Sequence, residues 1–365
     1  MGYNIEMLCW YKQNKRTFDN LNESYNKKNL NLCYFNNVFS IFLWPIWWTF
    51  IFISIIMKNN DLIHVLNYNS VAPALIAGKL KRIPIIYEIM DTSYDAFVLP
   101  MLFKSIFMTI DKFFMKFSDA IVLVDENQQD QFRGIPNSRI SIIYDSAPDL
   151  LKSIEPMYND SNNSDFTIVY IGVLYKIRHL NIEKLCDIVQ NIEGIQLIIA
   201  GYGDLADYIR EKADHSNGKI QFLGRVSYSK ALDISLGADA LIVLRDSRVR
   251  TNKYICGSKI WEAMMCGKPI IINKGTSTAD KVLKENCGLI IDAEDVNEIK
   301  KAIMKLRDDP ELCKLLGTNG RKAYEERYSW DIMGQKLIDL YQDLTKSSDD
   351  HPLTTQKLVA KEVRK

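Results

Sequence analysis

The chain contains few of the residues that build metal and disulfide sites. It has four histidines in 365 residues, and none of them stands at the spacing of metal ligands. Its cysteines are odd in number, scattered, and free of Cys-x-x-Cys pairs; they are Cys9, Cys33, Cys186, Cys256, Cys266, Cys287 and Cys313. These patterns exclude a simple disulfide framework and a zinc ribbon, and they are typical of proteins in a reducing cytosol. We therefore expect no metal and a cytoplasmic protein.

An excess of charge of either sign is also lacking. The 46 basic residues are balanced by 45 acidic ones, so the formal net charge at pH 7 is +1. Proteins that bind nucleic acid need a surplus of basic residues to neutralise phosphates, and we therefore expect no nucleic-acid partner. The first 29 residues are mostly polar and contain no long apolar run, which predicts that no signal peptide opens the chain.

Apolar runs, many of them rich in Val, Ile and Leu, recur at intervals that leave room for helices. The first six are Ile5–Trp10, Leu32–Phe35, Leu62–Leu66, Ile83–Ile89, Ala120–Val124 and Ile140–Tyr144. The second six are Phe166–Ile171, Leu197–Ala200, Ile220–Leu223, Ala240–Leu244, Pro269–Ile272 and Gly288–Ile291. Continuous apolar runs indicate parallel strands that are buried on both faces. The pattern predicts an α/β fold with two doubly wound domains, which the length of the chain also suits.

Polar stretches set the predicted boundaries. The expected segments are a first domain at 1–150, a linker at 151–165, a second domain at 166–330, a C-terminal helix at 331–345 and a tail at 346–365. The linker contains the polar run Asp160–Asp165, which has no apolar period. The tail is polar and rich in charge, and we expect it to be frayed or disordered.

The most informative stretch is 257–291. It places Lys259 and Glu262 three residues apart, at the start of a predicted helix. Gly267 and Pro269 must end this helix, so the two charged side chains share one face of its first turn, near the positive end of the helix dipole. A lysine and a carboxylate in this position suit a ligand with both phosphate and hydroxyl groups. An ordinary solvated Glu–Lys pair has the same spacing.

This stretch resembles the signature of glycosyltransferase family 4, and the resemblance extends from about Gly2 to Leu344. Members of this family have the GT-B fold, in which two Rossmann-like domains face each other across a cleft. The resemblance implies a hexosyl- or glycosyltransferase that takes its sugar from a UDP- or GDP-linked donor, with retention of anomeric configuration and without a metal. It also implies that Glu262 binds the ribose hydroxyls of the nucleotide.

Further loops at the carboxyl ends of predicted strands resemble other parts of the family's donor site. The resemblance implies donor-binding roles for Gly172, Arg178, Gly201, Gly203, Arg225, Val226, Ser258, Lys259 and Glu262. Arg178 stands where the family brings a cation to the diphosphate, and the arginine fork can hold two phosphate oxygens. A solvated basic turn would contain the same residue. Lys259 is expected to assist Arg178 in stabilising the leaving diphosphate, and Arg225 and Val226 match the loop whose backbone contacts the nucleobase.

Several features depart from the family pattern. Val173 stands where a companion arginine is often found, Tyr254 where many relatives have a sugar-facing glutamate, and Met90 where a histidine is common. Asp91 keeps a carboxylate for acceptor orientation or proton transfer, although capping of the next helix explains it equally well. The family's usual first strand, glycine-rich loop and helix are missing, which predicts an open slot beside Ile5–Trp10. These departures leave a catalytically silent GT-B scaffold, which binds a membrane or a partner, as the alternative to an enzyme.

Two apolar segments indicate contact with a membrane surface. The stretch 38–57 has no charged residue and is long enough to span a bilayer, yet Pro45 interrupts it and predicted strands of one sheet flank it on both sides. The stretch 97–117 gathers lysines on one helical arc and apolar residues on the other, which is typical of a membrane-surface helix and equally of a helix packed on a sheet. We expect peripheral association with the inner face of the cell membrane. The acceptor is then lipid-linked or a saccharide, as in polysaccharide or glycolipid synthesis.

Overall fold

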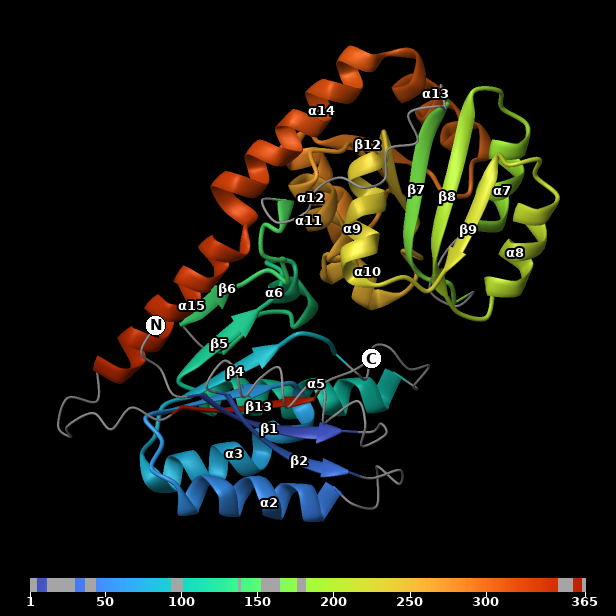
Figure 1. Cartoon of the computed structure of the whole chain (residues 1–365). Helices are drawn as coiled ribbons and strands as arrows, with labels where there is room; N and C mark the ends of the chain where they lie inside the picture. Colours follow the sequence, from blue (N-terminus) through green and yellow to red (C-terminus); the bar gives the residue numbers. More distant parts are fainter. Residues whose placement is uncertain are drawn as a thin grey trace. The chain divides into compact units, whose positions relative to one another are not determined.

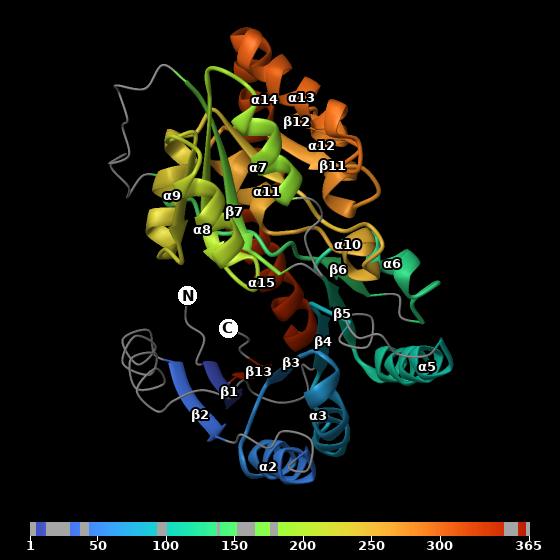
Figure 2. The same ribbon diagram turned by 90° about the vertical axis from the view of Figure 1, so that its right-hand side faces the viewer.

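A computed structural model of the chain describes residues 5–11, 30–36, 44–92, 101–136, 139–151, 165–175, 182–346 and 357–362. The chain forms two compact units, which Figures 1 and 2 show from two sides. Unit 1 comprises residues 1–143 and 335–365, and unit 2 comprises residues 144–334. Each unit contains one parallel β-sheet and its helices, which confirms the α/β class and the two Rossmann-like domains.

Sheet A, in unit 1, has seven parallel strands in the order β2-β1-β13-β3-β4-β5-β6. Six of them are runs that the sequence predicts: β1 (Ile5–Tyr11), β2 (Leu30–Asn36), β3 (Leu62–Leu66), β4 (Ile85–Ile89), β5 (Ala120–Leu123) and β6 (Ile140–Ile142). Strands β3, β4 and β5 are buried along almost their whole length. This burial is expected for apolar runs that lie between two layers of helices.

The seventh strand corrects the prediction for the end of the chain. The sequence predicts a frayed tail, but part of that tail forms β13 (Lys357–Glu362), which pairs in parallel with β1 on one side and with β3 on the other. It fills the slot that was expected to be open beside β1. The short apolar run Leu358–Ala360 is sufficient for a strand here because neighbours on both sides satisfy the backbone groups.

The helices of unit 1 are α2 (Trp44–Met57), α3 (Tyr68–Lys81), α5 (Met101–Phe117), α6 (Gln128–Gln131) and most of α15 (Trp330–Lys346). α2 and α5 cover most of the two predicted membrane segments, of which residues 38–43 and 97–100 lie outside the described part. Trp47, Ile51 and Ile55 of α2 belong to the core that packs on sheet A. Within the described part of the chain, no helix is both long and apolar enough to cross a membrane.

Sheet B, in unit 2, has six parallel strands in the order β12-β11-β10-β7-β8-β9. All six are predicted runs: β7 (Phe166–Val173), β8 (Ile195–Tyr202), β9 (Ile220–Gly224), β10 (Ala240–Val243), β11 (Ile270–Asn273) and β12 (Gly288–Ile291). The helices are α7 (Ile182–Gln190), α8 (Ala206–Asp214), α9 (Tyr228–Gly237), α10 (Arg250–Tyr254), α11 (Lys259–Met265), α12 (Ser277–Glu285), α13 (Val296–Asp308) and α14 (Pro310–Ala323), followed by a π-helical turn at Tyr324–Tyr328.

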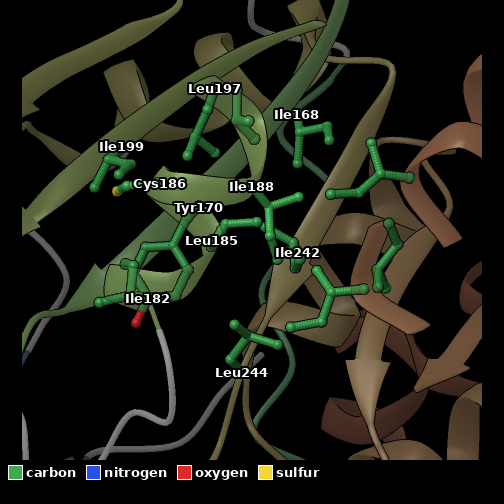
Figure 3. Packing of buried hydrophobic residues seen from close by; sticks show 14 of the residues in the cluster. Ile168, Tyr170, Ile182, Leu185, Cys186, Ile188, Leu197, Ile199, Ile242 and Leu244 are labelled. Atoms are coloured by element: carbon green, nitrogen blue, oxygen red, sulfur yellow. The ribbon is translucent and has the colours of Figure 1, made fainter. Parts of the chain in front are cut away.

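The core of unit 2 lies between sheet B and its helices (Figure 3). Leu185 and Ile188 of α7 share this cluster with Ile168 of β7 and Leu197 of β8. Ile242 extends the cluster to β10, and all five side chains are almost fully buried. Burial of this apolar surface holds the strands together, and it thereby fixes where the loops at their carboxyl ends begin.

The chain passes between the units at two places. The first passage is at Ile143–Tyr144, ahead of the predicted linker, whose residues 152–164 lie outside the described part. The second passage is within α15, after Gly334. Both the end of this helix and strand β13 therefore belong to unit 1.

Candidate functional site

The carboxyl ends of β7 and β10 meet at the topological switch point of sheet B. The chain enters the sheet at β7 and continues outward through β8 and β9. It then returns to the other side of β7 for β10 and continues outward through β11 and β12. Ligands of open α/β sheets bind at the carboxyl edge beside such a point. The residues just after Val173 and Val243 are therefore the first candidates for ligand contact.

Three predicted donor-site glycines bring the loops after β7 and β8 close together. Gly172 and Gly201 are paired across the two strands, and a Cβ added to Gly201 would lie 2.0 Å from the carbonyl oxygen of Gly172. Gly203 has φ 154°, and a Cβ there would lie 2.4 Å from the carbonyl oxygen of Leu174. The contact between the two backbones alone thus requires Gly201 and Gly203, whether or not a ligand binds.

Helix α11 carries the predicted lysine and carboxylate in its first turn, just after Ser258. The Nζ atom of Lys259 donates to Oε2 of Glu262 over 2.7 Å. The side chain of Glu262 is 6% exposed and that of Lys259 27%, so the pair is largely removed from water. The helix ends as predicted, because Gly267 has φ 65° and its amide donates to the carbonyl of Met264. A solvated surface pair, the simpler prediction, does not describe this carboxylate.

The charge of Glu262 acts on the groups around it. Burial and, after it, the carboxylate of Glu262 raise the pKa of Tyr228, the first residue of α9. Burial and the same carboxylate raise the pKa of the Cys266 thiol to about 12. Both groups therefore stay protonated at neutral pH, and the Tyr228 hydroxyl remains a hydrogen-bond donor.

Arg245 follows β10 at the switch point, and hydrogen bonds hold its backbone. Its amide donates to Oδ1 of Asn273 and its carbonyl accepts from Nδ2 of the same side chain, both over 2.7 Å. Asn273 thereby joins the end of β10 to the end of β11. The guanidinium of Arg245 fills the space beside Gly257, where an added Cβ would lie 2.4 Å from Nη1. Gly257 stands two residues before Lys259, so a second cation is located close to the start of α11.

The guanidinium of Arg225 lies over the ring of Tyr202 at the carboxyl ends of β8 and β9. The Cζ atom of Arg225 lies 4.8 Å from the centre of the ring, and Tyr202 is 39% exposed. Gly224 has φ 62°, which turns the chain sharply before Arg225 and Val226. The sequence identifies Arg225 and Val226 as site residues but not the aromatic partner of the arginine.

Two predicted catalytic residues lie outside the described part of unit 2. Arg178 lies between residues 175 and 182, outside the described part of the chain. Asp91 belongs to unit 1 and follows β4. Its amide and that of Met90 donate to Oδ1 of Asn67 over 3.3 and 3.0 Å. Asn67, which has φ 59°, thus joins the ends of β3 and β4 and holds the backbone of Asp91 in place.

No three His, Cys, Asp or Glu side chains converge to form a metal site in the part of the chain that the structure describes. His64 of β3 is buried and lies between two partners in unit 1. Its Nδ1 atom is 2.6 Å from the hydroxyl of Tyr341, and its Nε2 atom is 2.8 Å from Oε2 of Glu88. This histidine is a structural element of sheet A.

Comparison with known proteins identifies the larger part of unit 2. Residues 155–323 match the family described as "Glycosyl transferases group 1". Over 151 residues the chain is 31% identical to a GDP-mannose-dependent monoacylated alpha-(1-6)-phosphatidylinositol monomannoside mannosyltransferase of Corynebacterium glutamicum; this segment covers 40% of the chain and 39% of that protein. Over 201 residues it is 25% identical to the capsular polysaccharide biosynthesis glycosyltransferase CapM of Staphylococcus aureus, with 54% and 51% covered. The chain thus spans about two fifths to one half of these curated relatives.

Solved structures resemble the chain over almost its whole length. Alr3699/HepE of Anabaena, solved in complex with UDP, has a TM-score of 0.72 at 15% identity, and the match covers 93% of this chain and 100% of that one. A glycosyltransferase from Rickettsia africae has a TM-score of 0.70 at 13% identity, with 94% and 99% covered. Likeness at these identities shows the fold alone. The chain therefore has the GT-B fold, and its residues 155–323 match the glycosyl transferases group 1.

Proposed function

We propose that this chain is a glycosyltransferase that moves a sugar from a nucleoside diphosphate donor to an acceptor. The observation that carries the proposal is the Lys259–Glu262 pair in the first turn of α11, whose carboxylate is buried and which lies within the segment that matches the family. The lysine holds one carboxylate oxygen of Glu262, and the other oxygen can accept hydrogen bonds from ribose hydroxyls. The buried charge is thus paired before the ligand arrives.

Other residues of unit 2 supply the remaining contacts that such a donor needs. Arg178, Lys259 and Arg245 are the cations for the diphosphate, and they stabilise the negative charge that develops as the sugar departs. Arg245 supplies the second cation, because this chain has Val173 where the family often has a companion arginine. Tyr202 and Arg225 offer a flat surface on which the base can stack. In this proposal the cations neutralise the diphosphate without a metal ion.

The acceptor is a lipid-linked or other saccharide at the inner face of the cell membrane, and the sugar is transferred with retention. The names of two relatives support this choice of acceptor: one refers to a phosphatidylinositol monomannoside and the other to capsular polysaccharide biosynthesis. Asp91 orients the acceptor or takes its proton, and the hydrogen bonds from its backbone to Asn67 suit a residue whose position must be fixed. Retention rests on the resemblance to family 4.

Calorimetric titration of the full chain with UDP and with GDP tests the proposal. We expect one of the two nucleotides to bind with a dissociation constant well below millimolar. The protein should also release that nucleotide from its sugar-linked form when a membrane lipid extract is present. A chain that binds neither nucleotide is a silent scaffold, and the proposal is then wrong.

A further inference from the structure

Three helices of unit 1 form one layer on sheet A. The chain moves from β2 to β3, from β3 to β4 and from β4 to β5 in the same direction across this parallel sheet. Right-handed crossovers in one direction place their helices on the same face, and these helices are α2, α3 and α5. α3 contacts both of the others, and the ring of Tyr68 packs against Phe107 and Phe114 of α5. Figures 1 and 2 both show α2 and α3 side by side beneath the strands.

Helix α2 is apolar on the side that faces away from the sheet as well as on the side that faces it. Trp47, Ile51 and Ile55 are spaced four residues apart and are buried. At 100° per residue, Ile53 and Met57 lie on the opposite side of the helix, and they are 47% and 79% exposed. A helix with apolar residues all round is suited to a protein core or to lipid, and in the described part of the chain Ile53 and Met57 of α2 are left exposed.

The outward sides of α3 and α5 are apolar too. The exposed large apolar residues of the three helices are Ile46, Trp48, Ile53, Ile56 and Met57 of α2, Ile76 and Leu80 of α3, and Leu102, Phe103, Ile106, Phe113 and Phe117 of α5. We call this set the α2–α3–α5 surface. Single exposed apolar residues are normal, but a group of this size on adjoining helices marks an interaction site.

The same helices carry almost no negative charge. α2 has no charged residue, and α3 has two lysines and no acid. α5 has one acid, Asp111, which is buried and accepts a hydrogen bond from the hydroxyl of Tyr87. Lys112 and Lys116 of α5 lie at helical angles between its buried side and its exposed apolar side. Long side chains in this position can hold their ammonium groups at the edge of an apolar surface.

We propose that the α2–α3–α5 surface docks unit 1 on an anionic lipid bilayer. The apolar side chains enter the boundary between headgroups and acyl chains, and Lys112 and Lys116 of α5 contact lipid phosphates. A second copy of the chain suits the surface less well. In a two-fold contact the surface would meet itself, so that lysines would face lysines without an exposed acid from these helices to pair with them.

Vesicle binding tests this inference. Full-length protein is mixed with sedimentable vesicles of phosphatidylcholine alone, or of phosphatidylcholine with phosphatidylglycerol, and we expect it to sediment mainly with the anionic ones.

Ile53→Glu and Phe113→Glu should each lower the partition coefficient by about tenfold or more, because an inserted apolar side chain is lost and a repelled charge is added. The matched control is Leu283→Glu in α12 of unit 2, where the leucine is 71% exposed, and it should have no effect. Glutamine at Lys112 and at Lys116 should lower binding to anionic vesicles by about fivefold per lysine.

The substituted apolar residues Ile53, Phe113 and Leu283 are exposed, and circular dichroism melts of all variants check that they fold like the wild type. The inference is overturned if the wild type stays in the supernatant with both vesicle types, or if Ile53→Glu and Phe113→Glu sediment like it. It is also overturned if the chain is a dimer without lipid and both substitutions make it monomeric. The inference rests on the proposed function only for the location of the acceptor, and the vesicle assay involves no sugar. If the chain binds vesicles but neither UDP nor GDP, the proposed function is wrong and this inference still holds.

Discussion

The Nζ atom of Lys259 and Oε2 of Glu262 lie 2.7 Å apart in the first turn of α11, and the carboxylate is much more buried than the lysine. Two opposite charges this close attract each other strongly where water is largely excluded. Removal of the lysine leaves the buried carboxylate without this partner. Burying the carboxylate of Glu262 is costly, and the hydrogen bond from Lys259 fixes its orientation. A fixed, buried carboxylate is suited to binding the hydroxyls of a ligand.

Glu262→Ala should weaken binding of the preferred nucleotide by about ten- to a hundredfold, because at least one charge-assisted hydrogen bond to ribose is lost. Calorimetric titration with UDP or GDP measures this loss. Glu294→Ala removes an exposed carboxylate from the same unit and should leave the affinity unchanged. If Glu262→Ala binds the nucleotide as tightly as the wild type, the ribose assignment is wrong.

Arg178→Ala should weaken binding of the nucleoside diphosphate far more than binding of the nucleoside, because the proposed partner of Arg178 is phosphate. Titrations with UDP and uridine, or with GDP and guanosine, give the two losses separately. The control is Arg210→Ala in α8, whose guanidinium pairs with Asp207 on the surface and should affect neither ligand. An equal loss for both ligands would assign Arg178 a structural role.

The strands could be predicted from the sequence because parallel strands buried on both faces leave continuous apolar runs, which are a local property. Strand β13 could not be predicted in this way. Its short run Leu358–Ala360 pairs with β1 and β3, which come from the first part of the chain, and its flanks are charged. Only the open slot beside β1 indicated that some segment was needed there.

The candidate site, too, could be predicted from the sequence only in part. The spacing of Lys259 and Glu262 is enough to place both in one helical turn, and the structure has them there. The hydrogen bonds of Asn67 and Arg245 left no such signal, because they join the ends of neighbouring strands and depend on the strand order. The ring of Tyr202 was missed for a related reason, since Gly-Tyr-Gly does not determine which way the ring points.

Gly201→Ala should destabilise unit 2 by about 1–3 kcal/mol or more, because the added methyl group would overlap the carbonyl oxygen of Gly172. Urea unfolding measures this change, and nucleotide binding should be lost with it. Gly334→Ala is the control, because Gly334 lies within α15 and an added Cβ there meets only the indole nitrogen of Trp330, at 4.0 Å. Alanine favours a helix, so this variant should be more stable than the wild type by up to about 1 kcal/mol. A tolerated Gly201→Ala would mean that β7 and β8 can separate at their ends.

The hydroxyl of Tyr341 is the hydrogen-bond partner of a buried histidine. It lies 2.6 Å from Nδ1 of His64, while Nε2 of this ring faces the carboxylate of Glu88. His64 and Tyr341 are 3% and 9% exposed, so water does not easily replace the hydroxyl. The contact ties α15 to β3 and β4 within unit 1.

Tyr341→Phe removes the hydroxyl and leaves the ring, which also packs edge-on against His64. The histidine nitrogen is then buried without its partner, and the free energy of unfolding of unit 1 should fall by about 1–3 kcal/mol. Hydrogen exchange of the amides in α15 should become faster, because the helix loses a contact that holds it on sheet A. Tyr175→Phe removes the hydroxyl of a tyrosine that is 39% exposed, and it should change neither quantity. If Tyr341→Phe unfolds at the same urea concentration as the wild type and its α15 amides exchange at the same rate, apolar packing alone holds α15 on sheet A.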